Sequence, residues 1–265
     1  MPELPDVEVF GRYIDSTALN KKIAHVEISD ADVLDRVSKR SLQQQLHGQR
    51  LQRTHRHGKN LFVAFAKDRL LRLHFGMTAF PSYYKDEADT PDYTRVRLEF
   101  TNGYSLAYSS KRKLGRVGIV RNLDEFIERE QLGPDPLSDQ FDFELFRERL
   151  GSRRGSAKAA LMNQAAIAGI GNVYSDEILY HCDIQPESNI ARVIEQKGKR
   201  LYSVMNRVLD KTIEAGAEPE RFPRSYLTRR REAGAACGRC SGTIRKHTVS
   251  GRSAYFCNKH QKRLS

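Results

Sequence analysis

The spacing of apolar residues changes once along this 265-residue chain, and that change predicts two differently folded parts. Up to about residue 131, apolar and polar residues alternate in short runs separated by turn signals such as residues 101–103. This alternation is typical of β-strands joined by hairpins. After Leu132-Gly133-Pro134-Asp135-Pro136-Leu137, apolar residues recur at helical spacing instead. The expected fold class is therefore α+β, with more than one domain.

The first part is predicted to be a β-sandwich or barrel opened by one helix. Residues 6–17 form the expected helix, with Val7, Phe10 and Ile14 on one face. The expected strands cover residues 22–28, 50–56, 60–66, 70–75, 94–100, 104–109 and 116–120.

The second part is predicted to be helical, ending in a basic linker. Residues 218–236 are rich in arginine and include proline and glycine, which indicates an exposed linker. The expected helices cover residues 141–150, 156–168, 173–182 and roughly 195–215, the last closed by Gly216.

The N-terminus carries two candidate catalytic groups. If Met1 is removed, Pro2 has a free secondary amine, which attacks an electron-poor carbon such as C1′ of a sugar and becomes an iminium cation. Glu3 lies next to it and is able to move protons. The alternative is that Pro5 and the acidic residues around it only mark the start of a helix.

The C-terminus carries the most specific local motif. Cys237 and Cys240 are separated by two residues, and so are Cys257 and His260, with a hairpin-length insert between the pairs. Zinc takes four such ligands in a closed, structural site. His247 is an alternative fourth ligand, and three free cysteines on a basic tail are the competing interpretation.

The insert between these pairs predicts a two-stranded hairpin. The expected strands are residues 243–248 and 253–256, which places Arg252 at the tip of a metal-bound hairpin. There Arg252 either holds a phosphate or is an ordinary solvated turn residue.

A second candidate phosphate site lies in the helical part. Gly169-Ile170-Gly171-Asn172 separates two predicted helices, so the glycines allow a tight turn and Asn172 offers amide donors beside a helix N-terminus. A helix-hairpin turn without a ligand has the same local sequence.

The charge balance favours a polyanionic partner. Lysine and arginine number 45 against 33 aspartates and glutamates, a net charge of +12. Nucleic acid is the usual partner of such proteins, although basic membrane-surface and ribosomal proteins share this balance. No apolar run reaches the ~18 residues of a membrane span, and the acidic N-terminus is unlike a signal peptide, so we expect an intracellular protein. We expect a monomer, because the sequence shows no heptad pattern and no strongly apolar exposed helix. Four cysteines are too few for a disulfide framework.

Taken together, these motifs resemble the formamidopyrimidine-DNA glycosylase family, which also includes endonuclease VIII. The resemblance covers nearly the whole chain, and the order of its motifs is specific. It is carried by residues 2–8, Gly58-Lys59, His74-Phe75-Gly76-Met77, residues 132–138, residues 169–174 and the finger with Arg252. Leu4 resembles the formamidopyrimidine branch, since the endonuclease VIII branch usually has glycine there.

The resemblance implies a β-sandwich domain at 1–131, a helix-two-turns-helix domain at 132–232 and a zinc finger at 233–265. It implies a bifunctional glycosylase and abasic-site lyase that flips a damaged base out of duplex DNA and cleaves the strand by β,δ-elimination. Oxidised purines are the implied substrates; oxidised pyrimidines, or damage binding without catalysis, are the alternatives. The implied catalytic residues are Pro2, Glu3 and Lys59, and the implied DNA contacts are Met77, Arg112, Lys158, Asn172 and Arg252.

The chain departs from the family pattern at several places. Asp6 stands where glutamate is usual, and Leu114 where a phenylalanine wedge is common. His260 replaces a fourth cysteine, and residues 216–237 lack a long glycine-bearing loop that covers oxidised guanine in many relatives. The fold and the chemistry therefore transfer better than the substrate.

Overall fold

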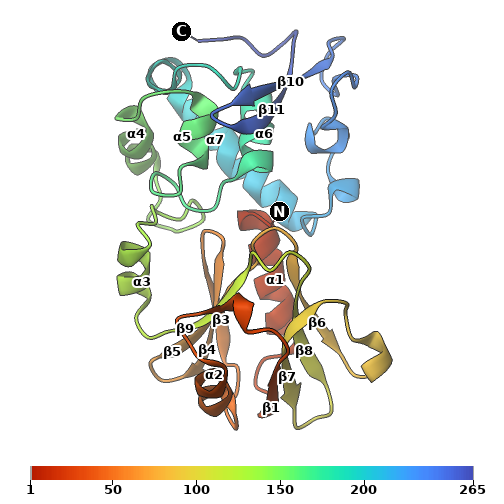
Figure 1. The fold of residues 1–265 in the computed structure, drawn as a ribbon. Helices are drawn as coiled ribbons and strands as arrows, with labels where there is room; N and C mark the ends of the chain where they lie inside the picture. The colour runs from red at the N-terminus through yellow and green to blue at the C-terminus, as the bar shows by residue number, and fades with distance from the viewer. Residues whose placement is uncertain (1, 265) are drawn as a thin grey trace. The chain divides into compact units, whose positions relative to one another are not determined.

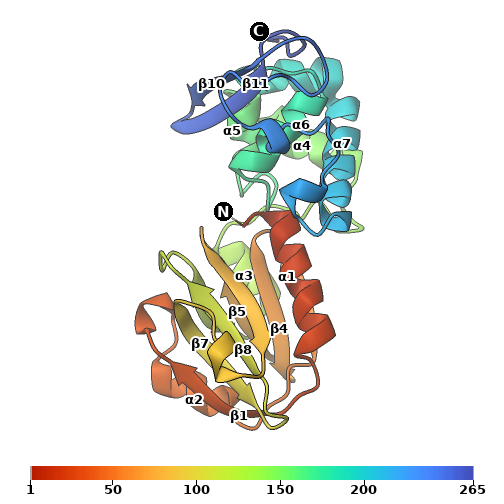
Figure 2. The same ribbon diagram turned by 90° about the vertical axis from the view of Figure 1, so that its right-hand side faces the viewer.

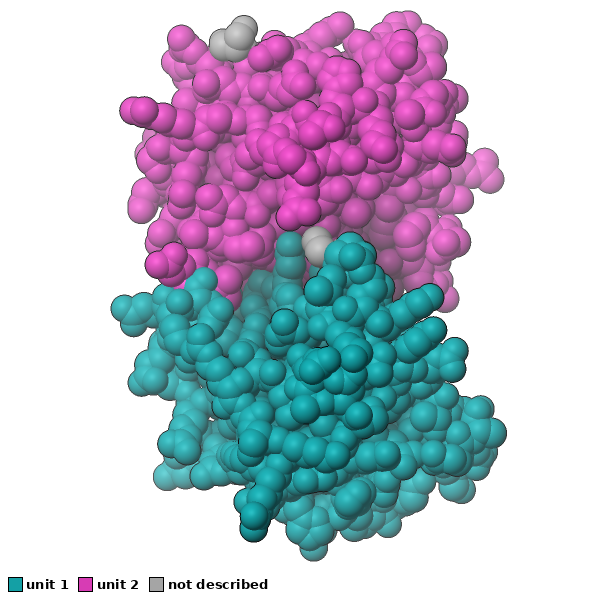
Figure 3. Space-filling view, viewed as in Figure 1, with its two compact units in different colours: residues 1–2, 6–130 teal, residues 3–5, 131–265 magenta. Residues whose placement is uncertain are grey.

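In the computed structural model, which describes residues 2–264, the chain forms two compact units (Figure 3). The first consists of residue 2 and residues 6–130, and the second of residues 3–5 and 131–264. The predicted finger segment, residues 233–265, falls within the second unit, where its strand β11 (Arg252–Cys257) contacts helix α6 (Asn172–His181). None of the helices among residues 2–264 combines the length and apolarity that a membrane crossing requires.

The first unit is a β-sandwich with an N-terminal helix (Figures 1 and 2). One sheet is antiparallel with the strand order β1-β7-β8-β6, and the other has the order β2-β9-β5-β4-β3, with only β2 and β9 parallel. The strands are β1 Ile23–Ile28, β2 Leu34–Asp35, β3 Arg53–His57, β4 Asn60–Ala66, β5 Arg69–His74, β6 Ala79–Tyr84, β7 Thr94–Phe100, β8 Ser105–Ser110 and β9 Arg116–Val120.

The core of this unit lies between the sheets and under helix α1 (Leu4–Thr17). Alternate residues of β7 enter it, as the period-two pattern predicts; Val96, Leu98 and Phe100 are all at most 4% exposed. Phe10 of α1 packs on Phe75, with ring centroids 4.7 Å apart.

Several elements of the first unit were not predicted from the sequence. β6 contains Pro81, which normally argues against a strand, but β6 is an edge strand, where a missing N–H is tolerated. The short helices α2 (Lys39–Leu46) and α3 (Leu123–Arg129) were also missed; side-chain N-caps from Ser38 and Asn122 begin them.

The second unit packs its helices around the long α7 (Ile190–Glu214), with α4 (Phe143–Gly151), α5 (Ala157–Met162) and α6 against it. Two predicted boundaries were wrong. α5 ends at Met162 rather than 168, because Asn163 leaves the helical region at φ −75°, ψ 107°. α7 begins at Ile190 rather than 195, because the Asn189 side chain accepts from Arg192 N–H and caps it.

The unit ends in a hairpin of β10 (Ile244–Val249) and β11. Its tip is Ser250-Gly251, both with positive φ (49° and 73°), so Arg252 is the first strand residue after the turn, opposite Val249.

Candidate functional site

The Glu3 carboxylate is fixed on the first turn of helix α6. Its side chain is 1% exposed. Oε2 accepts hydrogen bonds from the N–H groups of Gly171 (2.8 Å) and Tyr174 (3.2 Å), and Oε1 accepts from Val173 N–H (2.8 Å). The N-cap residue of this helix, Gly171, supplies no side-chain cap. Glu3 therefore caps the helix from far along the chain, and the helix dipole favours its negative charge.

Glycine at position 171 makes this contact possible. A Cβ at Gly171 would lie 2.4 Å from Cδ of Glu3, so any larger residue would displace the carboxylate. Gln164 holds the preceding loop: its Oε1 accepts from Gly169 N–H (3.0 Å) and its Nε2 donates to the Ile170 carbonyl (2.7 Å). Gly169 in turn accepts from Leu4 N–H (3.1 Å), so the loop and residues 3–4 hold each other in place.

A buried ionic network lies beneath the same loop. Lys158 and Asp176, both 0% exposed, form an ion pair. Lys158 Nζ also donates to the Asn172 carbonyl (3.1 Å), and Arg231 donates to Asp176 Oδ2 (2.8 Å). Burial lowers the pKa of the Lys158 ammonium and raises that of the Asp176 carboxyl, and the attraction between the two opposes both shifts. The network ties Asn172 to the linker residue Arg231.

This environment corrects the prediction that Lys158 contacts DNA phosphate. Its helix N-terminus suggested an accessible ammonium, but the side chain has no exposed surface and its donors go to Asn172, Ser175 and Asp176. Lys158 instead supports the loop from inside the unit.

Asn172 is the predicted phosphate-binding residue of this loop. Its carbonyl is held by Lys158 and by Arg231 (3.3 Å), whereas its side-chain Oδ1 is buried without a hydrogen-bond partner among residues 2–264. An unpaired buried amide oxygen costs free energy. A bound molecule that donates a hydrogen bond to Oδ1, or that turns the side chain toward itself, would remove this cost.

In the first unit, Lys59 lies in the turn between β3 and β4. Gly58 before it has a φ of 57°, and His57 pairs with Asn60 across the turn, as a tight hairpin requires. The side chain of Lys59 is partly exposed.

Burial, assisted by the nearby charges of Arg72, Lys59 and Arg116, lowers the pKa of His74 to about 4, so this histidine is neutral at neutral pH.

Met77, Arg112 and Leu114 lie on two loops of the first unit that pack together. The Arg112 N–H donates to Thr78 Oγ1 (3.1 Å). At Gly76, whose φ is 55°, a Cβ would lie 2.4 Å from the Leu114 backbone, so only glycine permits the close approach. Met77 is 38% exposed and Leu114 46%, which is unusual for side chains of this kind. The two loops therefore present an apolar pair beside a cationic side chain.

The C-terminal ligand set comes together as predicted. One ligand atom from each of Cys237, Cys240, Cys257 and His260 lies within 4.8 Å of the others, so the group can hold a metal ion. His247 is excluded as the fourth ligand, since its ring is half exposed on β10, 3.6 Å from Glu187. Backbone N–H groups two residues on donate to each cysteine sulfur: Arg239 to Cys237, Gly242 to Cys240 and Lys259 to Cys257.

Helix α6 supports this group from the side. The Tyr180 hydroxyl lies 2.9 Å from Cys237 Sγ, and the Tyr180 carbonyl lies 3.2 Å from His260 Nε2. If Nε2 carries the proton it donates to this carbonyl, and Nδ1 is left to face the sulfurs, 3.4 Å from Cys240 Sγ. Arg252, on the adjacent hairpin, is exposed, and its side chain makes no hydrogen bond or ion pair with residues 2–264.

Asp176 and Glu177 were missed by the sequence reasoning, together with Arg231. Asp176 Oδ2 also accepts from Tyr255 N–H of the finger (3.1 Å), and Glu177 accepts from the N–H groups of Leu227 and Thr228. Their sequence signal was two adjacent acidic residues inside a helix whose other positions include Val173, Ile178 and Leu179. The supposed exposed linker is thereby attached to helix α6.

Comparison with known proteins gives consistent matches. The formamidopyrimidine-DNA glycosylase N-terminal domain model matches residues 1–117, and the formamidopyrimidine-DNA glycosylase H2TH domain model matches residues 132–223. Relatives named formamidopyrimidine-DNA glycosylase from Protochlamydia amoebophila and Bacillus licheniformis are each 30% identical, with 99% of this chain and 100% of the relative covered.

Solved structures agree over the same extent. Lactococcus lactis Fpg in complex with DNA containing an abasic site has a TM-score of 0.89 and 27% identity, covering 98% of this chain and 100% of that one. The same protein in complex with DNA containing N7-benzyl-Fapy-dG also has a TM-score of 0.89 and 27% identity, with coverages of 99% and 100%.

Proposed function

The chain belongs to the formamidopyrimidine-DNA glycosylase family, and on that premise we propose that it excises oxidised purines, of the 8-oxoguanine or formamidopyrimidine type, and then cleaves the DNA strand. The observation that carries the proposal is the Glu3 carboxylate, fixed by three backbone N–H groups directly after Pro2. A protein that only binds DNA has no need of a fixed carboxylate beside an N-terminal amine.

Pro2 acts as the nucleophile once Met1, which lies outside the described residues, has been removed. The nitrogen lone pair attacks C1′, and the glycosidic bond breaks with its electron pair leaving on the base. For C1′ to form the iminium double bond, its bond to O4′ must also break; Glu3 takes the amine proton and returns one to O4′. The iminium then acidifies C2′–H; Glu3, again a carboxylate, takes this proton, and the 3′ C–O bond breaks with its electron pair leaving on the phosphate. Loss of the C4′ proton to water then breaks the 5′ C–O bond in the same way.

DNA is held by groups from both units. Asn172 and Arg252 bind backbone phosphates, Lys59 lies near the lesion and its phosphate, Arg112 pairs with the orphaned base, and Met77 fills the gap in the stack. The exposure of Met77 and Arg252 supports these roles. We assign residues 1–131, 132–232 and 233–265 to catalysis, DNA binding and the finger, in a protein that acts as a monomer.

The metal of the finger is zinc in this proposal, held by Cys237, Cys240, Cys257 and His260. Three sulfurs and one imidazole nitrogen are the donor set that zinc prefers, and four protein ligands leave no position for a substrate. Bound zinc stabilises the fold of the hairpin that carries Arg252. The Tyr180 hydroxyl donates to the Cys237 sulfur and keeps it oriented.

Borohydride trapping of the untagged protein tests the mechanism, because reduction converts an iminium into a stable crosslink. We expect a crosslink on duplexes with 8-oxoguanine and a weaker one with 5-hydroxyuracil; the reverse order would indicate the pyrimidine branch. Mass spectrometry of the crosslinked peptide should locate Pro2. No crosslink on either duplex or on an abasic-site control would identify a binding protein without catalysis.

Two variants separate chemistry from binding. Glu3→Gln should abolish base excision. Its amide would set a donor against an N–H group of residues 171–174, so DNA binding should also weaken, and excision is therefore compared at saturating protein. Glu214→Gln, which changes an exposed carboxylate on α7, is the matched control. Arg252→Ala should weaken binding to all lesions alike and reduce the slope of log K against log salt by about one.

A further inference from the structure

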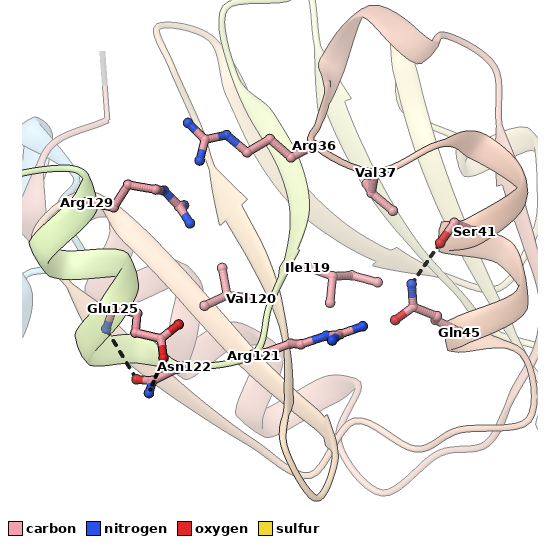
Figure 4. A pocket seen from close by; sticks show the side chains of 10 residues that line it. All are labelled: Arg36, Val37, Ser41, Gln45, Ile119, Val120, Arg121, Asn122, Glu125 and Arg129. Atoms are coloured by element: carbon pink, nitrogen blue, oxygen red, sulfur yellow. Dashed lines mark hydrogen bonds between the residues drawn. The ribbon is translucent and has the colours of Figure 1, made fainter.

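A surface cavity of about 400 Å³ in the first unit contains none of the residues proposed for catalysis or DNA binding (Figure 4). Its walls come from the segment after β2, from helix α2, from the end of β9 and from helix α3. Three arginines line it, namely Arg36, Arg121 and Arg129.

The cavity exposes an unpaired strand edge. On one side, β9 pairs with β5 as far as Val120. On the other side, its partner among the strands of residues 2–264 is β2, whose pairing stops at Asp35 and Gly118. The chain leaves the sheet at Arg36, which has a φ of 54°. The outer edge of β9 at Ile119 and Val120 therefore faces the cavity, and such an edge is a template for a further strand.

The charge of the cavity favours an acidic occupant. Its lining contains three arginines and a single carboxylate, Glu125, which already accepts from Asn122 Nδ2 (3.2 Å). Arg121 makes no hydrogen bond or ion pair with residues 2–264, and in Figure 4 its side chain extends beside Ile119 toward Gln45. Arg129 contacts Glu130 (3.1 Å), but its side chain is 44% exposed, so water weakens that pair.

The shape and the walls favour a peptide over DNA. Val37 and Ile119 give the cavity an apolar wall, which offers a contact for an apolar side chain and none for a phosphate. A DNA duplex also has no backbone amides to pair with a strand edge. An extended peptide with alternating acidic and apolar residues satisfies the edge, the arginines and the apolar wall together.

We propose that the free edge of β9 and this cavity bind an acidic, extended segment of a partner protein, which adds to the sheet as a short strand. Its carboxylates pair with Arg36, Arg121 and Arg129, and one apolar side chain packs on Val37 and Ile119. The site is separate from the proposed catalytic residues, so it would recruit a partner without competing for the lesion.

The test uses the full-length protein and a fluorescent peptide of alternating aspartate and valine, with binding followed by anisotropy. Two peptides serve as controls: one has lysine in place of aspartate, and the other has N-methyl groups on alternate amides. We expect saturable binding of the first peptide, none of the lysine peptide, and at least about tenfold weaker binding of the N-methylated peptide, because it cannot complete the ladder.

Protein variants locate the site. The double variant Arg121→Ala, Arg129→Ala should weaken peptide binding by about tenfold or more, whereas Arg147→Ala, an exposed arginine on α4, should not. Cleavage of lesion DNA should be the same in all three proteins. The proposal is wrong if the acidic peptide does not bind, if N-methylation has no effect, if both variants behave alike, or if undamaged duplex DNA displaces the peptide stoichiometrically.

Discussion

Replacing Asp176 by asparagine should destabilise the second unit more than any surface charge change. Asp176 is completely buried, and its side chain acts only as an acceptor. Oδ1 accepts a hydrogen bond from Lys158 Nζ, and Oδ2 accepts from Arg231 Nη2 (2.8 Å) and from Tyr255 N–H (3.1 Å). Asparagine has nearly the same shape but one acceptor and one donor. In either orientation of the amide, a buried donor faces another donor, and the Lys158 ammonium loses its counter-charge.

The size of the effect follows from burial. Removing one partner of a buried ion pair costs about 3–5 kcal/mol, because the remaining charge stays desolvated. Removing both charges should cost much less, so Lys158→Met combined with Asp176→Asn should recover a large part of the loss. For comparison, Glu214→Gln breaks an exposed pair with Lys211 and should cost under ~0.5 kcal/mol.

Urea unfolding of wild type, Lys158→Met, Asp176→Asn and the double variant, followed by circular dichroism, gives the free energies of unfolding for a double-mutant cycle. Lesion-DNA affinity should fall in Asp176→Asn and should stay low in the double variant even though its stability returns, because the Asn172 carbonyl has then lost the Lys158 donor. A loss below about 1 kcal/mol in Asp176→Asn, or simple additivity of the two changes, would refute the argument that this pair is buried and coupled.

Three further predictions concern other parts of the molecule. The pKa of His74 is lowered to about 4 in the folded state, against 6.5 in the unfolded state, so the fold favours the neutral ring and stability falls as pH drops from 6.5 toward 4. Between pH 7 and 5, the free energy of unfolding measured in urea should fall by about 2 kcal/mol more in wild type than in His74→Gln. Gly171→Ala should abolish cleavage with Glu3 intact, because the added Cβ occupies the carboxylate position, and a variant as active as wild type would contradict that geometry. Chelation of the finger metal, or Cys240→Ser, should lower DNA affinity while the melting temperature of the first unit stays unchanged. Atomic absorption of the purified protein should give one zinc per chain. A metal-free protein with full DNA affinity would contradict the role of the finger.

Much of the fold was predictable because local sequence determined it. The strands 60–66, 94–100 and 116–120 were predicted to the residue: 94–100 alternates toward the core, and 60–66 is a continuous buried apolar run between clear turn residues. Helices α2 and α3 were missed because they are short, and β6 because Pro81 is tolerated only at a sheet edge, a position that the sequence does not reveal.

The candidate site shows a different limit. The finger ligands were predictable because metal-ligand spacing is local, and the four side chains lie together as expected. The anchoring of Glu3 on the loop at Gly171 depends on a contact between residues 168 positions apart, which no local pattern encodes. A family resemblance assigned Glu3 a role, but only the structure explains why Gly171 must be glycine.

Lys158 shows why residue type alone is a poor guide to a phosphate contact. An early-helix lysine in a basic protein is usually solvated, and the sequence contains nothing near it that indicates otherwise. Its partner Asp176 lies 18 residues away on the next helix, and Arg231 lies beyond α7. Buried acids must be paired, so Asp176 and Glu177 inside the buried helix α6 required donors; Asp176 finds them in Lys158 and Arg231, and Glu177 in backbone N–H groups. Searching for the partners of buried acids would therefore have placed Lys158 and Arg231 beneath the loop rather than on the DNA.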